Sequence, residues 1–382
     1  MKVGILYPRS TVYPGMMLDF VDGIRIYLKK QGLEGKVQLV TESVGFAGSE
    51  KEVYEKAEKL LVLENADLLV AYIDEKVTGL LEPLMLSSGK LLLIVNPGAN
   101  YPENWIPQLN IIHLTLQDAF LCWLSGKMAG SGKEKNGLMA SSFYDCGYLH
   151  VATMVNGFNQ SGGNIVYNYI NKQKNWNEFR ISELTDYLET NPATRNLLCI
   201  FDSPPASLFY RELNQYAKAG QLQLFVSPMM LQPQALENSG SGFQFDIEGC
   251  LPWSSSNEKT ANAEFIDYYH QQTKRQPDIF ALLGWEVGMV IEKILLADID
   301  FNLGEKITAA LVGSTLDGPR GEMKLDSRTN YYCTPFVKCR IPKNSANIEM
   351  KPEAFPLQGW ESFVQENTEN AGSGWINTYL CY

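Results

Sequence analysis

The sequence predicts an α/β protein made of two lobes, each with a parallel sheet covered by helices. Short apolar runs alternate with segments of helical periodicity along most of the 382 residues. The strand candidates are apolar on both faces, which is typical of parallel strands buried between helices. The alternation stops near residues 125–135 and then resumes, which indicates a second lobe.

The first lobe begins with four strand candidates separated by helices. The segment 15–30 carries Met16, Phe20, Ile24 and Tyr27 at helical spacing. In chain order, the predicted elements are a strand at 3–7, a helix at 15–30, a strand at 37–42, a helix at 50–63, a strand at 66–72, a short helix at 78–87 and a strand at 91–95.

The second lobe repeats this pattern after Lys133, and two long helices follow it. Its predicted elements are a strand at 137–142, a helix at 147–160, a strand at 164–169, a helix at 181–189, a strand at 197–201, a helix ending at 219, and strands at 222–226 and 243–250. Helices are then expected at 260–274 and 278–297. From Ile341 onward, frequent Pro, Asn and Gly predict an irregular tail.

Charge and hydropathy disfavour a nucleic-acid partner and direct insertion into a membrane. The formal net charge is −11 and the basic residues are scattered, which disfavours a nucleic-acid partner. No apolar stretch reaches the roughly 18 residues of a membrane-spanning helix, so direct membrane insertion is not expected.

No motif predicts a cofactor, a metal ion or a catalytic centre. The seven cysteines and three histidines lack the spacing of a zinc site. Lys133 follows a glycine-rich turn, but Glu134 stands where a phosphate-binding loop needs Ser or Thr. Cys146 lies in a strand-to-helix turn without the glycine or the histidine of a nucleophile elbow. We therefore expect a binding protein and not an enzyme.

Three aspartates follow predicted strand ends: Asp74, Asp145 and Asp202. Ligands of parallel sheets bind at this edge, in the loops that lead to the next helix. Each carboxylate could cap a helix, contact a ligand or take part in acid–base chemistry. The residue pattern alone leaves these three interpretations open.

The order of segments resembles the type I periplasmic solute-binding proteins, in their Leu/Ile/Val-binding branch. The opening strand and loop at 3–8, the passage from Gly157 to Val166 and the strand at 248–251 are similar to that family. The most specific match is the segment 316–326, which resembles the hairpin F-x-G-x-x-G-x-x-x-F-D near the family's end.

The resemblance implies two Rossmann-like lobes, hinged by three crossings, that close on a ligand. We expect residues 1–120 and 251–328 in the N-terminal lobe, and residues 121–250 and 329–382 in the other. The implied function is the substrate-binding component of an ABC importer, with a membrane permease as partner and an amino acid or similar small carboxylate as ligand. The alternative is a cytosolic sensor of amides or amino acids with the same fold.

The resemblance also places ligand contacts in the strand-end loops of both lobes. These residues are Tyr13, Tyr72, Ile73, Asp74, Asn96, Gly98, Ala99, Asn100, Tyr144, Asp145, Cys146, Asp202, Ser203 and Met229. Backbone N–H groups at helix N-termini suit a carboxylate. Met229 stands near where the family carries an acidic residue, and the Tyr, Met and Asn side chains suit a larger or partly aromatic ligand.

Localisation depends on what precedes Met1. The chain enters its first strand directly after Lys2, so the sequence shows no signal peptide. The resemblance implies a periplasmic protein whose signal is absent from this sequence. If Met1 is the native start, we expect a cytoplasmic protein.

Overall fold

The computed structural model describes residues 1–368, except positions 174, 203, 240–241 and 346. The chain divides into two compact units. Unit 1 contains residues 1–116 and 253–335, and the described part of unit 2 contains 117–252 and 336–368. The chain therefore passes from one unit to the other after residues 116, 252 and 335.

Unit 1 contains a five-stranded sheet in the order β2-β1-β3-β4-β5, and every neighbouring pair in it is parallel. Strands β3, β4 and β5 are buried along their whole length. The elements of this unit up to the first crossing are β1 (Lys2–Tyr7), α1 (Met16–Lys30), β2 (Gln38–Ser43), α2 (Glu50–Glu58), the π-helical turn η1 (Lys59–Leu63), β3 (Leu68–Tyr72), α3 (Glu75–Ser88), β4 (Leu91–Asn96) and β5 (Ile111–Thr115).

After the second crossing the chain adds more helices and a small antiparallel sheet to unit 1. These elements are α9 (Thr260–Thr273), α10 (Ile279–Ala297), α11 (Gly304–Val312), β11 (Thr315–Gly318), β12 (Gly321–Leu325) and β13 (Tyr332–Cys333). Strands β11 and β12 form the predicted hairpin. The predicted boundary of this lobe was residue 328, whereas unit 1 extends to residue 335. Residues 329–335 belong to unit 1 because β13 pairs with β12.

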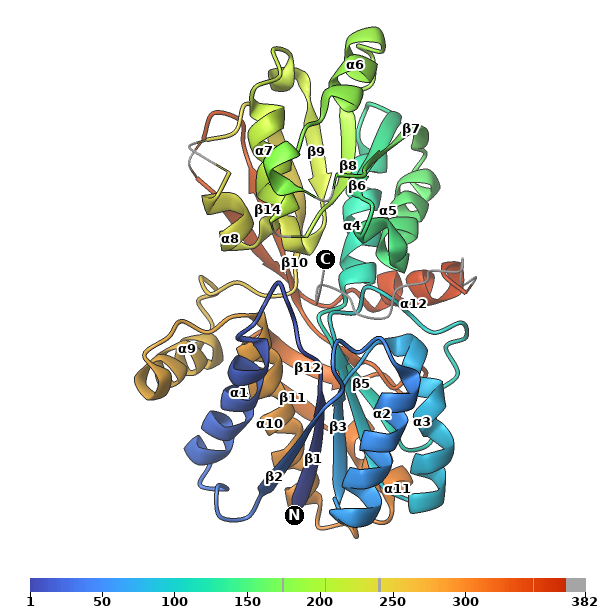
Figure 1. Ribbon diagram of the computed structural model, residues 1–382, viewed down its shortest axis with the longest axis vertical. Coiled ribbons are helices and arrows are strands. Elements are labelled where there is room, and N and C mark those ends of the chain that lie inside the picture. The colour runs from blue at the N-terminus through green and yellow to red at the C-terminus, as the bar shows by residue number, and fades with distance from the viewer. Residues whose placement is uncertain (174, 203, 240–241, 346, 369–382) are drawn as a thin grey trace. The chain divides into compact units, whose positions relative to one another are not determined.

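Helices α1 and α10 pack side by side along the unit 1 sheet (Figure 1). Two glycines make this close approach possible. A Cβ added to Gly23 would lie 2.3 Å from the Ala281 carbonyl oxygen, and one added to Gly284 would lie 2.0 Å from that of Phe20. Either distance is far inside van der Waals contact, so these positions require glycine.

Unit 2 contains a seven-stranded sheet in the order β15-β14-β10-β9-β8-β6-β7. Strands β7, β6, β8, β9 and β10 are parallel, and β14 and β15 add an antiparallel edge. Its strands and main helices are α4 (Asp118–Ser131), β6 (Asn136–Ser142), α5 (Leu149–Gln160), β7 (Asn164–Asn171), α6 (Ser182–Thr190), β8 (Asn196–Ile200), α7 (Pro205–Asn214), β9 (Gln223–Val226), α8 (Pro233–Glu237), β10 (Asp246–Leu251), β14 (Phe336–Ile341), β15 (Glu349–Glu353) and α12 (Leu357–Glu366). Short 3-10 turns lie at η2 (Asp145–Gly147), η3 (Trp176–Glu178), η4 (Ala219–Gln221) and η5 (Pro228–Leu231).

The irregular tail predicted from Ile341 is wrong for its described part. Residues 349–353 form the edge strand β15, and residues 357–366 form helix α12. The apolar side of α12 packs against α4, since Phe120 lies 5.4 Å from Trp360 and 5.3 Å from Phe363 between ring centroids. Helix α12 therefore contributes Trp360 and Phe363 to the core of unit 2.

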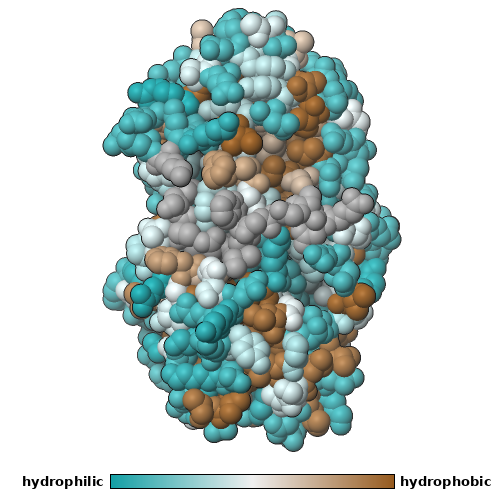
Figure 2. Space-filling model, turned by 45° about the vertical axis from the view of Figure 1, so that its right-hand side comes forward, coloured by the Kyte–Doolittle hydropathy of each residue, from teal (hydrophilic) through white to brown (hydrophobic). Residues whose placement is uncertain are grey.

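Figure 2 shows hydrophilic side chains over most of the visible face, with separate hydrophobic patches between them. No helix in the described part of the chain is long and apolar enough to cross a membrane. The six cysteines that the structure describes are free thiols, and five of them are buried.

Candidate ligand-binding surfaces

The loops that follow β3 and β4 in unit 1 are joined by the side chain of Asn96. Its Nδ2 donates to the carbonyl oxygen of Ile73 at 2.9 Å, and its Oδ1 accepts from the N–H of Gly98 at 2.8 Å. Gly98 has a φ of 76°, which favours glycine. Three predicted ligand contacts thus form one hydrogen-bonded loop pair at the carboxyl edge of the sheet.

Asp74 and Asn100 extend this loop pair. Asp74 caps α3, where its Oδ1 accepts from the N–H of Lys76 at 3.1 Å, and its Oδ2 accepts from Nδ2 of Asn100 at 2.9 Å. Burial raises the pKa of Asp74 to about 6, although both hydrogen bonds favour the carboxylate. Helix α3 begins at Glu75, earlier than predicted, because Asp74 supplies this cap.

Ala99 lies in the same loop and is 1% exposed. Within the described residues, no group accepts a hydrogen bond from its backbone N–H. Buried N–H groups almost always have an acceptor. A ligand oxygen would supply one here, on the loop that Asn96 holds in place.

Aromatic side chains lie beside these loops. The ring of Phe280 packs 5.3 Å from that of Tyr13 and 6.4 Å from that of Tyr72. Tyr13 and Tyr72 were predicted from the sequence. Phe280 was missed, because it comes from the start of α10 and more than 200 positions separate it from the other two.

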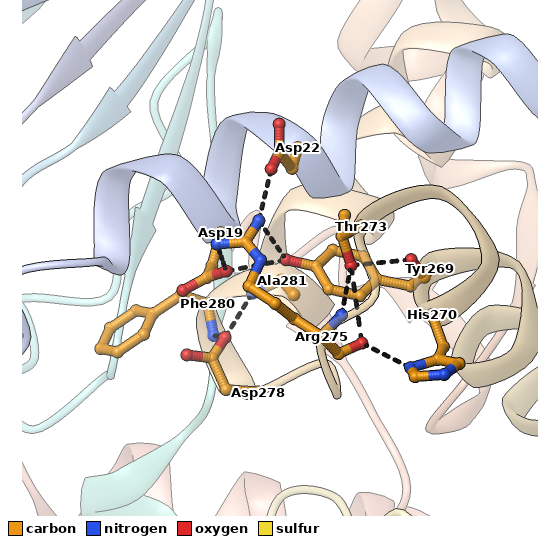
Figure 3. A network of polar contacts seen from close by, with 9 residues as sticks. All are labelled: Asp19, Asp22, Tyr269, His270, Thr273, Arg275, Asp278, Phe280 and Ala281. Carbon is orange, nitrogen blue, oxygen red and sulfur yellow. Dashed lines mark hydrogen bonds and ion pairs between the residues drawn. The ribbon is translucent and has the colours of Figure 1, made fainter.

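A polar network fixes the start of α10 against α1 (Figure 3). Arg275 Nη1 lies 2.8 Å from Asp19 Oδ1, and its Nη2 lies 2.5 Å from Asp22 Oδ2. Asp278 then caps α10 by accepting from the N–H groups of Phe280 and Ala281 at 2.9 and 2.8 Å. The two ion pairs and the cap together set the position of the Phe280 ring.

His113 lies in a buried cluster with Glu75 and Tyr331. Its Nδ1 lies 3.0 Å from Glu75 Oε2, its ring stacks on Tyr331 with centroids 4.2 Å apart, and all three side chains are buried. Among the described residues, no group of three or more His, Cys, Asp and Glu side chains could hold a metal ion.

In unit 2, Asp145 joins the loops after β6 and β8. Its Oδ2 accepts from the Ser142 hydroxyl at 2.6 Å and from the N–H of Asp202 at 3.1 Å. Asp145 and Asp202 are both fully buried. The structure thus brings these two predicted residues together. Ser142, the last residue of β6, was not predicted, because serine at a strand end carries no specific signal.

The other predicted residues of unit 2 differ in exposure. Tyr144 is half-buried and packs edge-on against Tyr148, with centroids 5.6 Å apart. The Cys146 thiol donates to the Phe143 carbonyl oxygen at 3.0 Å, and burial raises its pKa, so the reactive thiolate is disfavoured. Met229 is buried in η5. Ser203 lies outside the described residues.

We expect Asp145→Asn to change how the stability of unit 2 depends on pH. Burial raises the pKa of Asp145 to about 7, while a carboxyl of the unfolded chain titrates near about 4. The folded state therefore binds the proton more tightly, and ionisation destabilises it progressively as pH rises from about 4 to about 7. Relative to wild type, the unfolding free energy of the asparagine variant should rise by up to about 4 kcal/mol over that range.

Urea unfolding at several pH values measures this difference. Buried His150, whose pKa burial lowers to about 4, is present in both proteins, so its contribution cancels. Asp186→Asn on the exposed side of α6 is the matched control, and its stability difference from wild type should stay constant. A pH-independent difference for Asp145→Asn would contradict the assignment.

The comparisons with known proteins agree with this architecture. The family model described as periplasmic binding protein matches residues 1–340, so the chain belongs to the periplasmic binding protein family. Its fold is the type I fold of that family, as the sequence predicted. No curated protein gave a sequence match.

Solved structures share this fold at low sequence identity. An ABC transporter substrate-binding protein from Sphaerobacter thermophilus has a TM-score of 0.78 at 15% identity, over 93% of this chain and 98% of that chain. A solute-binding protein of R. palustris in complex with benzoate has a TM-score of 0.71 at 19% identity, over 92% and 95%. A leucine-binding protein from Thermotoga maritima has a TM-score of 0.69 at 12% identity, over 94% and 99%.

Proposed function

We propose that this chain is the solute-binding component of an ABC-type importer and delivers a small carboxylate-bearing solute to a membrane permease. The match of the periplasmic binding protein model to residues 1–340 supports this role. Structures of the same fold include an ABC transporter substrate-binding protein, a benzoate complex and a leucine-binding protein. The proposed place of action is the periplasm.

The buried backbone N–H of Ala99 is the observation that carries the proposed ligand chemistry. It lies on a loop that Asn96 and Asn100 already brace, and it has no acceptor among the described residues. The proposed solute carboxylate accepts from this N–H. Preorganised donors of this kind bind with little entropic cost.

The body of the solute is proposed to be apolar or aromatic. The ring of Phe280 packs against those of Tyr13 and Tyr72, and Tyr72 directly precedes Ile73, to whose carbonyl oxygen Asn96 donates. Aromatic rings bind apolar groups by burying large areas, and they favour other rings in stacked or edge-on geometry. This surface favours a branched-chain amino acid or an aromatic acid over a small, fully polar solute.

The proposed mechanism is closure on one solute that contacts the strand-end loops of both units. Contacts made only in a closed state shift the population toward that state. The three crossings after residues 116, 252 and 335 are the proposed hinge.

A thermal-shift screen tests the proposed solute class. The panel contains aliphatic amino acids, benzoate, hydroxybenzoates, the corresponding amides, and neutral alcohols of the same shape. A ligand at 100 times its dissociation constant stabilises the folded state by about 2.7 kcal/mol. We expect at least one carboxylate to raise the melting temperature while its matched amide or alcohol does not. Equal shifts for acid and amide, or no shift anywhere in the panel, would contradict the proposal.

A further inference from the structure

A cavity of about 560 Å³ lies in unit 2 at the edge of the sheet opposite the proposed solute-binding loops. It is lined by the first residues of β8 and β9, which are Asn196 and Gln223, and by the last turn of α4. The predicted ligand contacts follow the other ends of these strands. A cavity of this volume is in the range that holds small organic ligands.

The polar lining of this cavity offers acceptors. Asn196 donates through Nδ2 to the Glu134 carbonyl oxygen at 2.8 Å, and Gln223 donates through Nε2 to Glu248 Oε1 at 3.1 Å. Since a carbonyl and a carboxylate can only accept, these contacts fix which end of each amide is the nitrogen. The side-chain oxygens Asn196 Oδ1 and Gln223 Oε1 accept no hydrogen bond from the described residues.

Glu248 supplies the negative charge. Its Oε1 lies 3.7 Å from Arg340 Nε and accepts from Gln223, whereas its Oε2 has no hydrogen bond or ion pair with the described residues. The carboxylate is 27% exposed, and burial raises its pKa despite the nearby arginine. The charge of Glu248 is therefore only partly balanced by the protein.

The rest of the lining suits a cation with a short apolar chain. Lys133 and Glu134 are both exposed and line the same cavity, so their charges offset each other. Met128 and Phe225 supply apolar walls. The lining therefore combines open acceptors, one negative charge and an apolar wall.

We propose that this cavity is a second ligand site and binds small primary ammonium compounds. The ammonium group donates to Glu248 Oε2 and to the open amide oxygens of Asn196 and Gln223, and the carbon chain packs on Met128 and Phe225. Charge-assisted hydrogen bonds of this kind are stronger than those between neutral groups. The site is separate from the proposed solute-binding loops, so either proposal can fail without the other.

NMR of protein labelled at its methionine methyl groups tests this site, with n-butylammonium as the probe. The Met128 methyl resonance should shift saturably, while the Met229 resonance, in η5 at the other edge of the sheet, stays in place. The neutral isostere n-butanol and the anion butyrate should give no saturable shift of Met128.

Two matched variants decide the role of the carboxylate. Glu248→Gln should weaken n-butylammonium binding at least tenfold, and an unchanged Met229 resonance shows that the variant is folded. Glu134→Gln removes an exposed charge that solvent screens, so it should weaken the binding much less than Glu248→Gln does. The proposal is overturned if Met128 shows no saturable shift, if Glu248→Gln binds as wild type does, or if the two variants weaken binding equally.

Discussion

Replacing Arg320 with methionine is expected to lower the unfolding free energy of unit 1 by about 3–5 kcal/mol. Arg320 lies in the turn between β11 and β12, and its side chain and that of Glu286 are both 0% exposed. Its Nε and Nη2 donate to the two oxygens of Glu286 at 2.8 and 2.5 Å. Its Nη1 donates to the Thr115 carbonyl oxygen and to the Thr334 hydroxyl, both at 3.0 Å. The variant leaves the Glu286 carboxylate buried without its cation.

Urea unfolding of two further variants isolates this cause. In Glu286→Met with Arg320→Met, no buried charge remains unpaired, so most of the lost stability should return. Lys324→Met removes an exposed ion pair with Glu322 in the same hairpin and should have almost no effect. A double variant as unstable as the single one would show that packing, and not the unpaired charge, sets the loss.

Gly284→Ala is expected to destabilise unit 1 by about 3 kcal/mol, the upper end of the usual cost of overpacking. The added Cβ would lie 2.0 Å from the Phe20 carbonyl oxygen and 2.9 Å from its carbon, so α1 and α10 would have to separate. Thermal or urea unfolding measures the loss.

Gly79→Ala in α3 is the matched control for Gly284→Ala. Gly79 is an exposed glycine in a helix of the same unit, and a Cβ there meets no atom within 4 Å. Alanine at this position should stabilise the protein by about 0.5–1 kcal/mol, because it restricts the unfolded chain. Similar effects of the two substitutions would contradict the close helix packing.

The sequence predicted most of the parallel strands because they are short, apolar and bounded by turn residues. It missed α4, which was taken for a break between the lobes. Phe120, Cys122 and Trp123 are buried on several sides of this helix, so its sequence lacks an amphipathic period. Gly126 and Gly130 are residues that in a sequence indicate a loop. Gly126 is in fact a packing residue, since a Cβ there would lie 2.0 Å from the Met154 carbonyl oxygen.

The C-terminal elements were missed for a related reason. Strand β15 lies at the sheet edge and contains Pro352, and α12 follows Pro356. Proline is tolerated at a sheet edge and just before a helix, but in a sequence it indicates irregular structure. Pairing with β14 and packing on α4 determine this segment, and neither contact is visible in the local sequence.

The site predictions followed from strand ends and from the resemblance to the family. They named Asn96, Gly98 and Asn100 as ligand contacts, and the structure joins these residues to Ile73 and Asp74 by hydrogen bonds. They did not include Phe280, because it contacts a residue that is distant in the chain. They did not include Ser142, because a serine at a strand end is unremarkable in type. The cavity of unit 2 was also not predicted, since Asn196, Gln223 and Glu248 come from three different strands.

The central claim is that one solute is bound by the strand-end loops of both units, and calorimetric titration of two variants tests it most directly. The variants are Tyr13→Ala in unit 1 and Tyr144→Ala in unit 2. Both tyrosines are half-buried, so neither substitution should unfold the chain. With a solute found in the thermal-shift screen, each variant should retain one site per chain and bind at least about tenfold more weakly. Tyr54→Ala on α2 and Tyr187→Ala on α6 are the matched controls and should bind as wild type does. Wild-type affinity in either Tyr13→Ala or Tyr144→Ala would contradict binding by both units.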